Sequence, residues 1–220
     1  MTPPAVGSLA LAALLGYALG AVPSGVLATR LCGAPDVRRV GSGHTGGTNV
    51  VRATGRVWAG AATAVLDIAL AAAAVVLAGA FWQGPWPAAL AGAAAVVGHN
   101  WSAYIGLRGG VGLSSITGML IAQGPLATLA ALVCAVAIWI SARRLLGHDA
   151  RSTVVTIALV PLLLVLFGQP LPVVVSGILG ALAIIARALE DWRRPYRRGE
   201  AFAQQFLRRK DAPRPPNERP

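Results

Sequence analysis

The sequence predicts an all-α polytopic membrane protein, and three observations lead to that fold class. Of the 220 residues, 55% are hydrophobic and only 12% are charged, whereas soluble domains carry about a quarter charged residues. The mean hydropathy is +0.64, and apolar stretches of the length of a membrane helix recur along the chain. The arginines, finally, are confined to short segments between these stretches.

Seven apolar segments are expected to cross the bilayer. These expected transmembrane helices cover residues 5–29, 57–81, 87–97, 113–121, 126–140, 153–167 and 171–189. The connecting segments alternate between basic and uncharged, so every Arg and the single Lys fall on one side or at its helix ends. Because cytoplasmic loops carry an excess of Lys and Arg, we expect the N-terminus outside and the C-terminus in the cytoplasm. The expected location is the inner (plasma) membrane of a bacterial cell, with multiple passes.

The charge distribution and the cysteines narrow the range of partners. We expect one membrane domain over residues 1–200 and a basic, Pro-rich cytoplasmic tail over residues 201–220. The net charge of +11 comes almost wholly from arginine, but its position in loops between apolar runs is that of a membrane protein, so no nucleic acid is expected. Cys32 and Cys134 have no Cys or His at ligand spacing, and neither a metal nor a cofactor is expected.

A hydrophilic segment at residues 40–56 separates the first two apolar runs. Its first part, residues 40–52, holds four glycines, three hydroxyl residues, Asn49 and Arg52. Glycines let consecutive backbone N–H groups turn toward one point, and arginine offers a bidentate fork suited to phosphate or carboxylate. The segment therefore indicates an anion-binding loop at a membrane surface, the alternative being a flexible, solvated connector.

A second polar segment, residues 98–115, repeats this pattern after the third apolar run. It begins with Gly98 and His99 and contains Arg108 and a run of glycines. Both segments suit phosphate groups, and neither contains the Gly-Lys-Ser/Thr of a P-loop. The simplest inference is an enzyme that joins a phosphate-bearing polar substrate to a lipidic one at the membrane surface.

Two polar residues within the apolar segments are candidates for the same site. Asp67 lies well inside the second expected transmembrane helix, where an ionisable residue usually faces inward with a partner. An arginine of the neighbouring loop is a candidate for that partner, and the alternative is that the carboxylate lies in a water-filled cavity. Ser24 follows Pro23 near the end of the first expected transmembrane helix. There it either faces a polar cavity or accompanies a tolerated kink.

These motifs resemble those of a known family. Residues 22–25, 36–38 and 41–52, the Leu-Asp pair at 66–67, and residues 98–112 look like the bacterial acyl-phosphate:glycerol-3-phosphate acyltransferases (PlsY type) in order and spacing. A third motif of that family would fall within the arginine-rich residues 190–200. The resemblance covers nearly the whole chain and implies the seven-helix fold of that family.

The resemblance also implies a reaction, in which an acyl chain passes from acyl phosphate to glycerol 3-phosphate and gives lysophosphatidic acid without a metal. It assigns catalytic roles to Ser42, Arg52 and His99. It assigns a supporting role to Asp67. Substrate binding would fall to Ser24, Gly41, Gly43, His44, Thr48, Asn49, Arg108, Gly109, Gly110 and Gly112.

The chain departs from the family pattern at several positions, and three functions stay open. His44 replaces an Asn, Gly47 an Ala, Ser102 a Pro and Val111 a Lys, and the His and Asn of the third motif are not found around residues 190–192. Either Arg108 and His44 replace the lost lysine charge, the substrates differ, or catalysis is lost. The candidates are a divergent acyltransferase, a non-catalytic relative that binds lipid phosphate or regulates a partner, and a small transporter.

Overall fold

The computed structural model describes residues 6–193, and all regular structure in that range is helical. The predicted all-α class is thereby confirmed for this part of the chain. The expected tail over residues 201–220 and the third-motif region beyond residue 193 lie outside the described residues. The helices in chain order are α1 (Val6–Gly20), α2 (Ser24–Leu31), η1 (Val37–Arg39), α3 (Gly47–Thr54), α4 (Val57–Phe81), α5 (Pro85–Asn100), η2 (Ala103–Ile105), α6 (Leu113–Gln123), α7 (Pro125–Leu146), α8 (Asp149–Leu166) and α9 (Leu171–Leu189).

Five segments of the described chain are long and apolar enough to cross a membrane. They are Val6–Leu31, Val57–Phe81, Leu126–Leu146, Asp149–Leu166 and Leu171–Leu189. The third and fourth expected transmembrane helices form the shorter helices α5 and α6, of 16 and 11 residues. An 11-residue helix rises about 16 Å, roughly half the thickness of a hydrocarbon core. The helical membrane class follows directly, whereas the count of seven and the orientation stay predictions.

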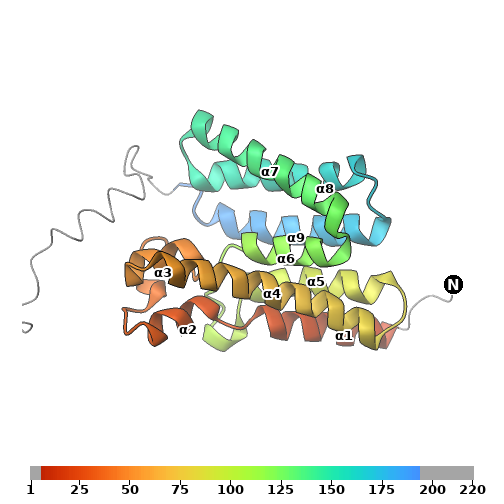
Figure 1. Ribbon diagram of the computed structural model, residues 1–220, viewed down its shortest axis with the longest axis horizontal. Coiled ribbons are helices and arrows are strands. Elements are labelled where there is room, and N and C mark those ends of the chain that lie inside the picture. The colour runs from red at the N-terminus through yellow and green to blue at the C-terminus, as the bar shows by residue number, and fades with distance from the viewer. Residues whose placement is uncertain (1–5, 194–220) are drawn as a thin grey trace, which may run out of the picture.

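The helices pack in layers, as Figure 1 shows. In that view α1 lies at the bottom, with α4 and α5 directly above it. The helices α6 and α9 occupy the middle of the bundle, and α7 and α8 lie at the top. The pairs α1 and α5, α4 and α6, and α8 and α9 make the most extensive contacts. The largest fully buried side chains include Met119 and Leu120 of α6, Leu164 of α8 and Ile184 of α9. The main apolar core is formed by side chains of α4 to α9, and these four residues belong to it.

The first expected transmembrane helix, residues 5–29, is divided into α1 and α2. Pro23 has no backbone N–H to continue the helical ladder, and the chain between Gly20 and Ser24 is not helical. At this break the carbonyl of Ala21 accepts a hydrogen bond from the hydroxyl of Ser102, in the loop after α5. The break therefore ties the first apolar run to the second polar segment.

The basic loop expected around residues 143–151 is almost entirely helical. Arg143 occupies the last turn of α7, Asp149 and Arg151 occupy the first turn of α8, and only two residues separate the helices. Gly147 ends α7 in the left-handed conformation at φ 61°, and the His148 ring accepts a hydrogen bond from the Arg151 N–H. The two capping residues explain why the turn is so short.

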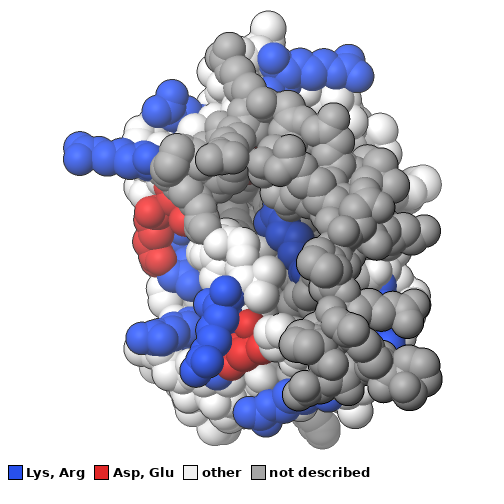
Figure 2. Space-filling model, turned by 90° about the vertical axis from the view of Figure 1, so that its left-hand side faces the viewer, with Lys and Arg blue, Asp and Glu red and all other residues white. Residues whose placement is uncertain are grey.

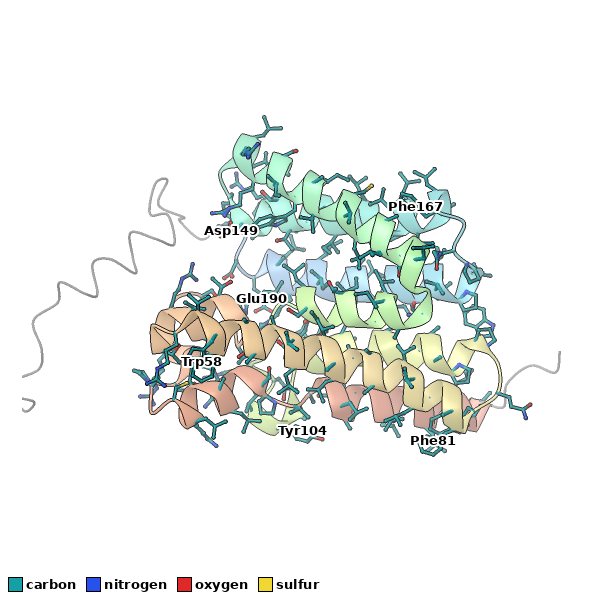
Figure 3. The ribbon with its side chains drawn as sticks, viewed as in Figure 1. Trp58, Phe81, Tyr104, Asp149, Phe167 and Glu190 are labelled. Atoms are coloured by element: carbon teal, nitrogen blue, oxygen red, sulfur yellow. The ribbon has the colours of Figure 1, made fainter. Side chains whose placement is uncertain are left out.

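The charged side chains gather at one end of the bundle. Figure 2 shows arginines and acidic residues together on this face. Asp149 and Glu190 lie at this end in Figure 3, whereas Phe81 and Phe167 lie at the opposite end. Most of the described arginines belong to α2, η1, α3 and the ends of α7, α8 and α9, or to the loops beside them, and Arg108 lies in the loop between η2 and α6. This arrangement agrees with the separation of basic and uncharged connections in the sequence.

Glycine allows α1 and α5 to touch, and this contact can be tested. A Cβ at Gly16 would lie 2.0 Å from the Ala91 carbonyl oxygen, whereas a Cβ at Gly7 would meet nothing within 4 Å. Overpacking costs about 1–3 kcal/mol, so Gly16→Val should lower Tm in detergent by roughly 2–12 °C. Gly7→Val is the matched control, and equal Tm values for the two variants would contradict the packing assignment.

Candidate active site

Asn49 organises the first polar segment. Its amide nitrogen donates to the Ser42 hydroxyl at 2.7 Å and to the His44 carbonyl at 2.9 Å. Its amide oxygen accepts from Arg52 at 2.8 Å. The Asn49 side chain is buried at the start of α3, so one amide fixes the hydroxyl, the loop and the guanidinium relative to each other.

Several glycines of the first polar segment stand where the backbone conformation or a close neighbour leaves no room for a side chain. Gly41 and Gly43 have φ angles of 56° and 78°, in the left-handed region. A Cβ at Gly41 would lie 2.5 Å from the Asn49 amide oxygen. Where α3 crosses α4, a Cβ at Gly47 would lie 2.5 Å from the Gly60 carbonyl oxygen. The loop therefore folds tightly over Asn49 and seats α3 directly on α4.

Asp67 has a different partner from the one expected. The Ser24 hydroxyl donates to its carboxylate, and Nδ1 of His99 lies 3.5 Å from the same oxygen atom. All three side chains are buried. The partners of Asp67 are therefore a hydroxyl from α2 and an imidazole from α5, and not the candidate arginine. Ser24 thus makes a buried polar contact with Asp67 beside the break.

The second polar segment folds back on His99. The backbone N–H of Gly110 donates to the His99 carbonyl at 2.9 Å. A Cβ at Gly110 would lie 2.1 Å from the His99 Nε2 atom, so only glycine fits against the ring. The two polar segments are joined directly, since the Thr45 N–H donates to the Gly109 carbonyl at 3.4 Å. The prediction that they form one site is consistent with this contact.

The C-terminal end of α9 closes the site with residues that the sequence reasoning missed. Arg187 is buried and donates through its guanidinium to the carbonyls of Gly109 and Gly110, each at 3.3 Å, and it also pairs with Glu190. Asp191 lies 2.8 Å from Nε2 of His44. Arg187 lies inside an expected transmembrane helix, so the signal that singled out Asp67 could have found it.

These elements surround a cavity of about 900 Å³. The predicted residues that line it are Ser42, His44, Thr48, Asn49, Arg52, Asp67, His99 and Gly112. Ser24, Gly41, Gly43, Gly109 and Gly110 lie behind this lining and hold it in place through the contacts above. Arg108 is exposed and does not line the cavity, whereas Val111, at the position of the family lysine, does. The structure therefore does not place the Arg108 charge at the position of that lysine.

The remaining wall comes from α7 and α8 and was not predicted. Trp139, Arg143, Asp149 and Thr153 line the cavity there. The Trp139 indole N–H donates to the Thr153 hydroxyl at 3.3 Å, and the Arg143 guanidinium lies 5.5 Å from the centre of the Trp139 ring. Arg143 was expected in a basic loop between two transmembrane helices, and no sequence motif connected that loop with the two polar segments.

Comparison with known proteins identifies the family. The family model described as glycerol-3-phosphate acyltransferase matches residues 10–197. The chain belongs to the glycerol-3-phosphate acyltransferase family. A relative from Rubrobacter xylanophilus with that name is 39% identical over 82% of this chain and 87% of its own, and one from Methylorubrum extorquens is 39% identical over 83% of each.

Solved structures of this family share the fold. The crystal structure of PlsY (YgiH), an integral membrane glycerol 3-phosphate acyltransferase, in its glycerol 3-phosphate form superposes with a TM-score of 0.72. That protein is 28% identical, and the match covers 86% of this chain and 92% of PlsY. Its lysophosphatidic acid form superposes with a TM-score of 0.69 at 25% identity. The resemblance stated from the sequence motifs is confirmed.

The burial of His44 predicts a pH dependence of stability. Burial lowers the pKa of His44 below its ordinary value of 6.5 and the charge of Arg187 adds to this, although the hydrogen bond to Asp191 opposes it. The unfolded chain therefore binds a proton at a higher pH than the folded chain. The stability contributed by His44 is fully present above pH 6.5 and is lost as the pH falls toward the lowered pKa.

Thermal unfolding in detergent between pH 8 and pH 5 measures this contribution. Below pH 6.5, Tm of the wild type should fall more steeply than Tm of His44→Asn, because asparagine binds no proton. Parallel pH profiles for the two proteins would contradict the assignment.

Proposed function

We propose that this chain transfers an acyl group from acyl phosphate to glycerol 3-phosphate and forms lysophosphatidic acid. One observation carries the proposal: the two polar segments meet at a single cavity that combines phosphate-binding groups with a buried carboxylate–imidazole pair. Membership of the acyltransferase family supports the same reaction. The names of the PlsY structures, in glycerol 3-phosphate and lysophosphatidic acid forms, agree with this acceptor and product.

Each part of the site has a role in that reaction. Arg52 and the N-terminal end of α3 offer positive charge to a phosphate group. His99, oriented through Nδ1 by Asp67, accepts the proton of the acceptor hydroxyl as its oxygen attacks the acyl carbonyl carbon. The bond between that carbon and the phosphate oxygen then breaks, and the phosphate leaves with the electron pair. Arg52 stabilises this leaving group without a metal.

The alternating charge of the connections supports a topology for the proposed enzyme. We infer seven transmembrane helices in the bacterial inner membrane, with the N-terminus outside and the C-terminus in the cytoplasm. The charged end of the bundle, with the cavity, then faces the cytoplasm, where glycerol 3-phosphate is soluble. The acyl donor reaches the same cavity from the bilayer.

Product formation by the purified protein tests the reaction. Given acyl phosphate and glycerol 3-phosphate, the wild type should release lysophosphatidic acid and inorganic phosphate in equal amounts. Arg52→Glu should lower kcat/KM by about 10²–10³-fold, because a charge-stabilising donor is replaced by a repelling carboxylate. Arg30→Glu is the matched control, since Arg30 is exposed and lies outside the cavity.

An absence of product from well-folded wild type, beside an active control enzyme, would instead favour a non-catalytic relative. Equal activity of the Arg52→Glu and Arg30→Glu variants would remove Arg52 from the site.

A reporter fused after Pro220 tests the topology separately. Fluorescent protein, which folds in the cytoplasm, should fluoresce there, and alkaline phosphatase, which needs the periplasm, should be inactive. An active phosphatase fusion would reverse the proposed orientation.

A further inference from the structure

Arg143 faces the same cavity from the wall opposite the first polar segment. It occupies the last turn of α7, which packs on α6 and α8, whereas Arg52 belongs to α3, which packs on α4. Figure 1 shows α7 and α3 on opposite sides of the central helices. Both arginines line the cavity, so positively charged residues border it on two sides.

The cavity lining carries little positive charge for a site that binds two phosphate-bearing substrates. Among the described residues that line it, the arginines are Arg52 and Arg143 and the carboxylates are Asp67, Asp149 and Asp191. A phosphate monoester carries about −1.5 to −2 charges at neutral pH. Arg52 alone cannot balance two such groups, and Val111 adds no charge where the family has a lysine. Arg143 is the remaining cation of the described lining.

The present contacts of Arg143 leave it able to change partners. Its guanidinium pairs with the Asp149 carboxylate and lies over the Trp139 ring. The side chains of Arg143 and Asp149 are 49% and 35% exposed, and ion pairs with that exposure are weak. A phosphate dianion offers two oxygens to the guanidinium fork and carries more charge than one carboxylate. Phosphate can therefore displace Asp149, while Trp139 keeps the arginine at the cavity wall.

We propose that Arg143 forms a second phosphate-binding subsite, in which it exchanges Asp149 for the phosphate of one of the two substrates. The inference rests on the proposed function and adds a residue to it. Because Arg52 stabilises the phosphate that leaves acyl phosphate in the proposed reaction, the phosphate at Arg143 is that of glycerol 3-phosphate. Arg52 binds the other phosphate across the cavity.

Steady-state kinetics with each substrate varied in turn test the subsite. Arg143→Gln should raise KM for glycerol 3-phosphate by roughly 10- to 100-fold, the loss expected for a hydrogen-bonded charge. Arg143→Lys should show a smaller rise, because lysine keeps the charge without the fork. Arg144→Gln is the matched control: Arg144 is adjacent and exposed, but does not line the cavity, and its KM values should stay within twofold of wild type.

Asp149→Asn gives a result in the opposite direction. Removing the carboxylate that competes with phosphate should lower KM for the same substrate that Arg143→Gln affects. The substrate whose KM changes identifies the source of the phosphate. KM values that are equal in Arg143→Gln and Arg144→Gln for both substrates would overturn the subsite while leaving the proposed reaction intact.

Binding can be measured without turnover, so the subsite remains testable if the wild type makes no product. Glycerol 3-phosphate and inorganic phosphate should each raise Tm of the wild type and of Arg144→Gln, and the rise should be smaller in Arg143→Gln. Inactive wild type with this pattern would reject the proposed reaction and support the subsite. Equal rises in the two variants, or no rise in the wild type, would overturn the subsite.

Discussion

The buried carboxylate of Asp67 is the constraint on which the rest of the site depends. An ionised group within an apolar bundle is expensive unless hydrogen-bonding groups surround it, and here α2 supplies Ser24 and α5 supplies His99. Reaching Asp67 requires the first apolar run to break at Pro23 so that Ser24 begins a new helix. The position of His99 in turn places the second polar segment beside the first. One carboxylate thereby brings three helices to the same point.

The balance of charge around the cavity limits where a phosphate-bearing substrate can find positive charge. A lysine position of the second motif is occupied by Val111, and the described lining holds more carboxylates than guanidinium groups. Arg187, although close, is fully engaged by the Gly109 and Gly110 carbonyls and by Glu190, so it supports the second segment instead of facing the cavity. Among the described residues that line the cavity, positive charge for the substrates therefore comes from Arg52 and Arg143.

The sequence was sufficient for the helical class and for the two polar segments, because apolar length and glycine–hydroxyl–arginine density are local properties. It was insufficient wherever a contact joins distant segments. The partners of Asp67 lie 43 and 32 positions away along the chain, and no local pattern prefers them to a nearby arginine. Asp191 and Arg143 were missed for a related reason: each stands at a helix end, where a charge is common and indicates no particular partner.

The hydrogen bond between Ser102 and the Ala21 carbonyl has a consequence for how this sequence can vary. The family pattern that the sequence motifs resemble has proline at the position of Ser102, and proline has no hydroxyl to offer that carbonyl. In a membrane bundle a buried carbonyl without a donor is costly, so proline at position 102 is acceptable only if the backbone at the helix break changes as well. Position 102 and the helix break at Ala21, which are 81 residues apart in the chain, are therefore expected to evolve together. A substitution at one position is neutral or harmful according to the residue at the other position.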